Sequence, residues 1–150
     1  NSNGVIMLPA SASEIYGAGL VFEQRYRNLG HWSSESDRAE WRFQVREEGM
    51  FDLWINWALH RNATGSSISI RLDGKEISGA VPATGNWNDY KWAKLAALSL
   101  PRGLHRLTAQ SMGPLQSSFL IDLGQLQLVP QGRGKFPQTT PWQGVKLHPR

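Results

Sequence analysis

The sequence predicts an all-β domain, and three observations support that fold class. Apolar and polar side chains alternate along several runs, which is typical of strands with one face in a core and the other in water. Turn residues interrupt these runs about every ten residues. No long segment has apolar residues at helical spacing. The three observations together favour an antiparallel sandwich or barrel.

The clearest alternation occupies residues 39–45 and 51–59. In the first run Trp41 falls on the apolar side, so we expect it in the core. A short turn, Glu47-Glu48-Gly49, separates the two runs. Adjacent alternating runs joined in this way predict an antiparallel hairpin.

Shorter runs predict the remaining strands. These are residues 5–8, 20–23, 67–72, 75–81, 92–100, 104–111 and 119–129. Asp73-Gly74 predicts a tight hairpin turn, and Gly124 predicts a bend or bulge in the last strand.

The chain divides at Pro130. Residues 1–130 form the predicted domain, whereas residues 131–150 contain repeated Gly and Pro without alternation. We expect this second part to be a linker or C-terminal extension, pinned to the domain by Phe136 or Trp142. The first residue is Asn1 rather than Met, which suggests a processed chain or a fragment.

Composition narrows the function classes. The 150 residues suit one domain, and the absence of Cys excludes disulfides and thiol chemistry. No apolar run of about 18 residues is present, so we expect no membrane span, and no signal peptide is visible. The net charge of +4 comes from basic residues scattered among acids, a pattern that argues against nucleic-acid binding.

Catalytic motifs are also missing, so we expect no enzyme. None of the four His is spaced from another as metal ligands are, and neither a Gly-x-Ser-x-Gly elbow nor a phosphate loop occurs. No cleft for a pair of catalytic carboxylates can be located. His105 alternates with Leu107 and Ala109, which favours a core position with satisfied hydrogen bonds.

Two loops carry tryptophans suited to ligand binding. Residues 83–92 place Trp87, Tyr90 and Trp92 among small polar residues, and residues 25–37 hold Trp32. An exposed indole offers a flat apolar face, and neighbouring amides offer directional hydrogen bonds. The alternative for each aromatic residue is packing in the loop or the core.

Several short motifs resemble the carbohydrate-binding modules of families 6 and 35. The motifs are Gly30-His31-Trp32 followed by Asp37 and Glu40-Trp41, Gly49-Met50-Phe51-Asp52-Leu53, Thr84-Gly85-Asn86-Trp87, Leu100-Pro101-Arg102-Gly103-Leu104-His105, and Leu120-Ile121-Asp122-Leu123. The resemblance extends over about residues 6–129 and implies an antiparallel β-sandwich with jelly-roll topology.

The resemblance also implies a site. In such modules two loop aromatics hold a sugar ring, and the matching positions here are Trp32 and Trp87. Hydrogen bonds to the hydroxyl groups would come from Asp37, Asn86 and Asn88, and Tyr90 lies between a binding and a structural role.

Two departures from the family pattern stand out. The family's sugar-binding Asn falls at Leu120, which cannot make that hydrogen bond. The family's structural calcium would be held here by Glu14, Glu23 and Asp122, the hard oxygen ligands that Ca²⁺ prefers. Pro9 interrupts the first strand where an acid often begins the pattern, and the alternative for Glu14 and Glu23 is an ordinary surface position.

Two functions follow as expectations. The first is a non-catalytic module of a larger secreted, periplasmic or cell-surface bacterial protein, with a polysaccharide or oligosaccharide as its partner. The second is a structural or interaction domain of the same fold that has lost sugar binding and packs against other domains of its polypeptide.

Overall fold

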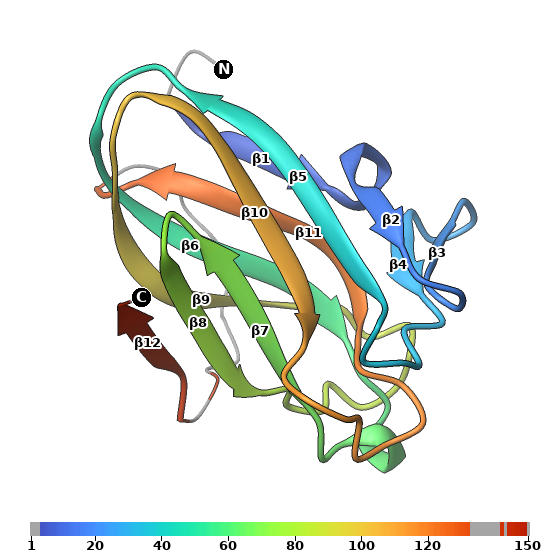
Figure 1. Cartoon of the computed structure of the whole chain (residues 1–150). Helices are drawn as coiled ribbons and strands as arrows, with labels where there is room; N and C mark the ends of the chain where they lie inside the picture. The colour runs from blue at the N-terminus through green and yellow to red at the C-terminus, as the bar shows by residue number, and fades with distance from the viewer. Residues whose placement is uncertain (1–3, 133–141, 143, 150) are drawn as a thin grey trace.

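The computed structural model describes residues 4–132, 142 and 144–149. It contains two antiparallel sheets packed face to face, as the alternating pattern predicts (Figure 1). Two short 3-10 helices, η1 (Ala10–Ala12) and η2 (Arg61–Ala63), lie in the connections. Among the described residues, no helix has the length and apolar character to cross a membrane.

The first sheet has the order β3-β4-β11-β6-β9, and β1 pairs with β11. Its strands are β1 (Ile6–Pro9), β3 (Val21–Glu23), β4 (Asn28–Gly30), β6 (Gly49–Ala58), β9 (Lys91–Leu100) and β11 (Asp122–Pro130). The register shifts between Leu123 and Gln125, which confirms the bulge predicted at Gly124. A Cβ atom at Gly124 would lie 2.6 Å from Asn56 Oδ1, so the Asn56 side chain would have to move to admit any other residue there.

The second sheet has the order β12-β8-β7-β10-β5-β2. Its strands are β2 (Glu14–Tyr16), β5 (Arg38–Val45), β7 (Ser67–Leu72), β8 (Lys75–Ala80), β10 (Gly103–Ser111) and β12 (Lys146–Pro149). The β7–β8 hairpin is as predicted, with Asp73 at φ 52° and Gly74 at φ 72° in its two-residue turn.

The predicted hairpin between residues 39–45 and 51–59 is wrong. Both runs are strands, but β5 belongs to the second sheet and β6 to the first, so the turn crosses the sandwich. The two apolar faces meet across the core instead of lying side by side. An apolar face can be buried in either way, and the alternation alone does not distinguish them.

Tryptophans anchor the core between the sheets. Trp41 is 1% exposed, and its Nε1 donates a hydrogen bond of 2.8 Å to the Pro9 carbonyl, which confirms its core position. Trp57 donates from Nε1 to the Pro82 carbonyl at 2.9 Å. His105 is also buried, with Nδ1 2.7 Å from Asp73 Oδ1 and Nε2 2.8 Å from the Pro101 carbonyl.

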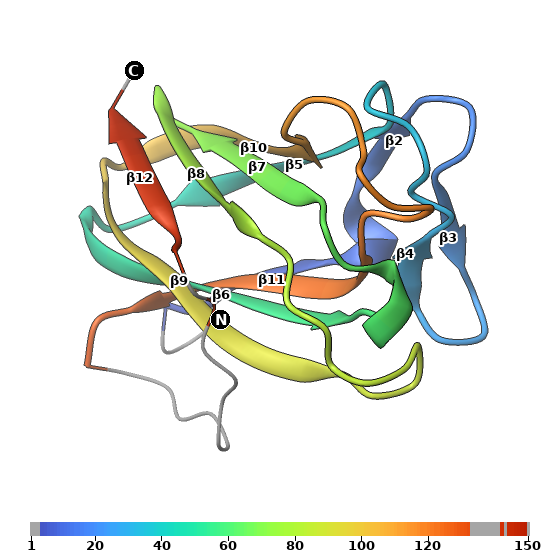
Figure 2. The ribbon, with the colours of Figure 1, turned by 90° about the horizontal axis from the view of Figure 1, so that it is seen from below.

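The described part of the C-terminal extension belongs to the sandwich. Trp142 is buried, and its ring centroid lies 5.2 Å from that of Trp57. After it, β12 adds a strand beside β8 (Figure 2). Phe136, the other predicted anchor, lies outside the described residues.

Candidate functional site

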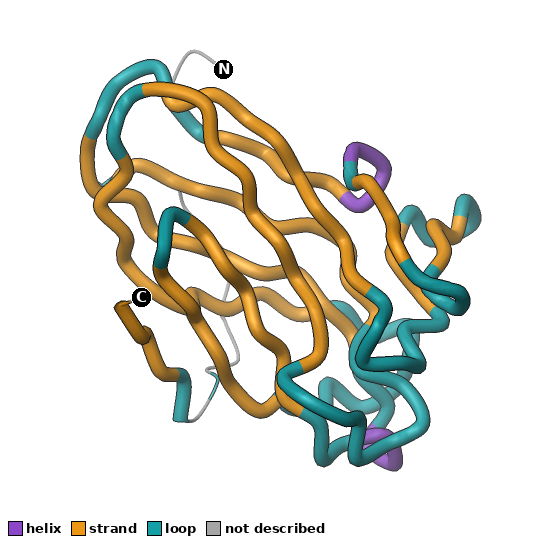
Figure 3. The backbone as a smooth tube through the Cα atoms, viewed as in Figure 1, coloured by secondary structure: helices purple, strands orange, loops and turns teal. Residues whose placement is uncertain are grey.

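Four rings from separate loops meet at one end of the sandwich, where the loops gather in Figure 3. The Trp87 and Phe119 centroids are 6.0 Å apart with edge-to-face geometry. The ring centroid of His60 lies 6.3 Å from that of Trp87, and the ring centroid of His31 lies 6.2 Å from that of Phe119. We call His31, His60, Trp87 and Phe119 the aromatic loop cluster. Its members are exposed or half-buried, so aromatic surface is available to a ligand.

The loop that carries Trp87 is held in place by hydrogen bonds to the end of β6. Thr84 Oγ1 accepts a bond of 3.1 Å from the Leu59 amide, and the Thr84 amide donates to the Leu59 carbonyl at 2.9 Å. The Arg61 amide donates to the Gly85 carbonyl at 3.1 Å. Gly85 has φ 126°, a conformation that side chains disfavour. These bonds fix the loop, so Trp87 is presented from a defined backbone.

Asn86 and Asn88 form a local turn beside Trp87. Asn86 Oδ1 accepts a bond of 2.8 Å from the Asn88 amide, and the Asn86 carbonyl accepts from the Asp89 amide at 3.2 Å. Both Asn side chains are exposed. Amide groups next to an indole are the polar partners that sugar hydroxyls require.

The predicted platform role of Trp32 is wrong. Its side chain is fully buried, and Nε1 donates to the Asp37 carbonyl at 3.2 Å. Its own carbonyl accepts a bond of 2.8 Å from the Leu120 amide. Leu120 is buried as well, so neither residue offers a group to a sugar.

The predicted ligand role of Asp37 is also corrected. The residue is fully buried, and its carboxylate organises the surrounding backbone. Oδ1 accepts from the Gly19 amide, and Oδ2 accepts from the Ser33 and Ser34 amides, all at 3.2 Å. A carboxylate that accepts several backbone N–H groups stabilises a loop and has little capacity left for a ligand.

Tyr90 belongs to a second, acidic region on the first sheet. This region, which we call the acidic cluster, contains Glu23, Asn28, Tyr90 and Asp122. Asn28 Nδ2 donates to Glu23 Oε1 at 3.0 Å. Burial, followed by the charge of Glu23, raises the pKa of Asp122 to about 7. Burial and the charge of Asp122 likewise raise the pKa of Tyr90 above its usual value.

The three predicted calcium ligands do not come together. Glu14 is exposed at the edge of the second sheet, 3.4 Å from Arg42 Nε, whereas Glu23 and Asp122 lie in the first sheet. Within residues 4–132, 142 and 144–149, no cluster of three or more acidic or histidine side chains could hold a metal. The predicted set is therefore wrong in Glu14.

The acidic cluster still has groups suited to a hard cation. Two side-chain oxygens, Asn28 Oδ1 and Tyr90 OH, are buried without a hydrogen-bond partner among the described residues. Both residues belong to the same group as Glu23 and Asp122, whose carboxylates repel each other when both are charged. Such orphaned oxygens fit a cation held by two carboxylates and neutral oxygens.

Sequence reasoning missed three members of the aromatic loop cluster. The sequence predicts Phe119 in the last strand, but β11 begins at Asp122, so Phe119 lies in the preceding loop. His60 caps η2, with Nδ1 accepting a bond of 3.0 Å from the Asn62 amide. His31 has φ 57°, which sets it apart from the strand before it. Only long-range folding brings these residues to Trp87.

Comparison with known proteins supports the architecture. No family model and no curated protein matches the chain. Among solved structures, a family 35 carbohydrate-binding module from Clostridium thermocellum has a TM-score of 0.70 at 16% identity, covering 84% of this chain and 98% of that one.

Two further solved structures are similar over most of their length. CBM6cm-2 of lichenase 5A from Cellvibrio mixtus, in complex with cellotriose, has a TM-score of 0.62 at 15% identity and covers 84% of this chain and 97% of that one. Xyl-CBM35, in complex with a glucuronic acid containing disaccharide, has a TM-score of 0.66 at 12% identity. The match covers 89% of this chain and 99% of that one. The chain therefore has the jelly-roll fold of the carbohydrate-binding modules of families 6 and 35.

Proposed function

We propose that this domain is a non-catalytic module that binds a polysaccharide or oligosaccharide at the aromatic loop cluster. The observation that carries the proposal is the position of Trp87, half-buried against Phe119 and His60 at the loop end of the sandwich. Its apolar surface can stack on the C–H face of a pyranose ring. The exposed amides of Asn86 and Asn88 lie on either side of it in the chain, where they can reach hydroxyl groups.

Similar solved modules support a sugar as the partner, since one is in complex with cellotriose and another with a glucuronic acid containing disaccharide. The geometry favours stacking on one indole rather than a grip between two, because Trp32 is buried. A single platform binds a chain end or a flat chain surface weakly. We place the module in a larger secreted, periplasmic or cell-surface protein, where it would hold its neighbours on a glycan.

The test is affinity electrophoresis of the whole chain through gels containing a panel of polysaccharides. We expect retardation by at least one glycan, and loss of that retardation in Trp87→Ala. Tyr26→Ala is the matched control, because Tyr26 is an aromatic residue with 50% exposure outside the cluster. An absence of retardation on every glycan, or equal loss in both variants, would rule out the proposed site.

A second candidate is a structural or interaction domain that has lost sugar binding. Two observations favour it: Trp32 is inaccessible, and Leu120 is buried where the family has its sugar-binding Asn. In that case no glycan retards the chain, and Trp87→Ala weakens association with a neighbouring domain of the same protein.

We also propose that the acidic cluster binds calcium through Glu23, Asn28 and Asp122. The ion would relieve the repulsion between the two carboxylates and give Asn28 Oδ1 a partner. Added Ca²⁺ should then raise the melting temperature of chelator-treated protein by mass action. The same addition of Ca²⁺ should leave the melting temperature of Asp122→Asn unchanged. It should raise the melting temperature of Glu14→Gln as much as that of the unsubstituted chain. A melting temperature of the unsubstituted chain that does not change when Ca²⁺ is added would contradict the proposal.

A further inference from the structure

A cavity of about 630 Å³ opens at the end of the sandwich opposite the aromatic loop cluster. β5 leads away from Asp37 toward this end, and β6 returns from it toward His60 (Figure 1). Apolar side chains contribute to the lining of the cavity, among them Ile6, Phe43 and Phe51. The volume lies in the range of binding sites for small ligands or one or two side chains of a peptide.

An unpaired strand edge borders this cavity. β5 pairs with β10 over its whole length, but β2 covers its other edge only from Arg38 to Glu40. Beyond Glu40, no strand of the described chain pairs with that edge, and Phe43 and Gln44 line the cavity there. Exposed N–H and C=O groups on a strand edge can pair with an added strand.

The facing sheet leaves the same side open. β1 pairs only with β11 among the described strands, so it too lies at a sheet edge. The Trp41 indole bridges the two sheets at one point by its bond to the Pro9 carbonyl. The cavity starts beyond this bridge and extends to the turn after β5. A slot between two strand edges is the shape that an extended peptide fills.

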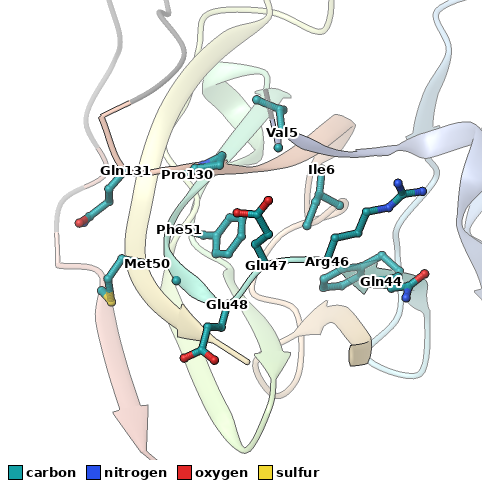
Figure 4. A pocket seen from close by; sticks show the side chains of 13 residues that line it. Val5, Ile6, Gln44, Arg46, Glu47, Glu48, Met50, Phe51, Pro130 and Gln131 are labelled. Atoms are coloured by element: carbon teal, nitrogen blue, oxygen red, sulfur yellow. The ribbon is translucent and has the colours of Figure 1, made fainter. Parts of the chain in front are cut away.

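Charge at the mouth of the cavity indicates which peptide would fit. Glu47 and Glu48 are exposed and make no ion pair with any described residue. Figure 4 shows the Glu47 carboxylate between Phe51 and Ile6, with the Arg46 guanidinium on the other side of Ile6. Two carboxylates against one guanidinium give this mouth a negative excess, although the whole chain carries +4. A basic residue is the complementary partner for Glu47.

We propose that this cavity binds an extended peptide of alternating apolar and basic residues, added as a strand along the open edge of β5. An apolar side chain of the peptide enters between Phe43 and Phe51. A neighbouring Lys or Arg leaves the strand on the opposite, solvent face and bends around the mouth of the cavity to the exposed Glu47 carboxylate. Backbone pairing supplies affinity, and the cavity and Glu47 supply specificity. The site is independent of the aromatic loop cluster and would let the domain hold a second polypeptide while it holds a glycan.

The experiment uses the whole chain and labelled acetyl-Val-Lys-Phe-Lys-Val-amide, with binding followed by fluorescence anisotropy. Two control peptides are matched to it: one carries Glu in place of both Lys, and one carries N-methyl groups on alternate amides. We expect saturable binding of the first peptide. The affinity should be at least about tenfold weaker for either control peptide. A tenfold change in affinity corresponds to about 1.4 kcal/mol of binding free energy.

Two variants of the protein separate the site from general attraction between charges. Glu47→Lys should weaken binding of the peptide at least about tenfold. Glu35→Lys makes the same charge change at an exposed position in the loop before β5, far from the cavity, and should leave binding unchanged. Both positions are exposed, so we expect both variants to fold.

The outcomes are distinct. Amide chemical shifts that move at residues 43–48 on peptide addition support the site, whereas shifts confined to residues 84–92 would overturn it. No saturable binding up to about 1 mM, which corresponds to about 4 kcal/mol, overturns the proposal. Equal losses in Glu47→Lys and Glu35→Lys, or full binding of the N-methylated peptide, overturn it as well.

Discussion

Trp32 and Trp87 come from loops of similar composition, yet they occupy opposite environments. Both lie near Gly and small polar residues, and both resemble a sugar platform in sequence. Trp32 is fully buried with its Nε1 bonded to the Asp37 carbonyl, whereas Trp87 is half-buried and faces His60 and Phe119. The buried carboxylate of Asp37 explains the difference, because it draws the loop around Trp32 inward.

The largest expected effect is the loss of Trp32. Trp32→Ala removes a buried indole and leaves a cavity, so we expect the free energy of unfolding to fall by about 3–5 kcal/mol. Urea denaturation measures it, with Trp87→Ala as the matched substitution. Because Trp87 is only partly buried, its loss should cost about 1–2 kcal/mol. Equal costs would remove the distinction between the two loops.

The second effect concerns the carboxylate behind Trp32. Asp37→Asn replaces one accepting oxygen by an NH₂ group that faces backbone donors, so we expect destabilisation of about 2 kcal/mol. The measurement is the urea midpoint, compared with Asp89→Asn in the Trp87 loop. A larger cost for Asp89→Asn would show that the Trp87 loop, not the Trp32 loop, is the one held by its acid.

The third effect depends on pH and concerns Asp122. Its folded-state pKa of about 7 lies above the unfolded value, so the folded chain binds a proton more tightly. The resulting stabilisation is fully present below the unfolded pKa near 3.8 and is lost as pH rises through about 7. In chelator, the melting temperature should therefore fall as the pH rises from about 4 to about 7, the interval between the two pKa values.

Asp122→Asn should flatten this fall, because it removes the charge that faces Glu23 and Tyr90. Thermal melts at a series of pH values provide the measurement. An identical pH dependence in Asp122→Asn would assign the effect to other groups.

Sequence patterns predicted the strands well and their partners less well. Alternation identified β5 and β6, and Asp73-Gly74 identified the β7–β8 hairpin, because both signals are local. The predicted pairing of β5 with β6 is wrong because alternation shows only that each strand has an apolar face. That face can be buried whether the two strands lie side by side in one sheet or in opposite sheets across the core. The prediction of Glu14 as a metal ligand beside Glu23 is wrong for the same reason, since the two residues lie in different sheets despite their closeness in sequence.

The sequence predicted one loop of the candidate site but not the other loops that meet it, for a related reason. The turn around Asn86 and the place of Trp87 in that loop follow from nearby residues. The rings of His31, His60 and Phe119 come from distant loops. The burial of Trp32 depends on Asp37 and on the Leu120 amide, which comes from the far end of the chain. No local pattern distinguishes an indole with such partners from one without them.

The most direct test of the central claim is calorimetric titration of one oligosaccharide, chosen from the retarding glycan, into three forms of the chain. The unsubstituted chain sets the affinity, Trp32→Phe keeps most of the buried volume, and Trp87→Ala removes the proposed platform. The account predicts unchanged affinity for Trp32→Phe and a loss of at least about tenfold for Trp87→Ala, with folding confirmed by thermal melts. A loss in Trp32→Phe with full binding by Trp87→Ala would contradict it.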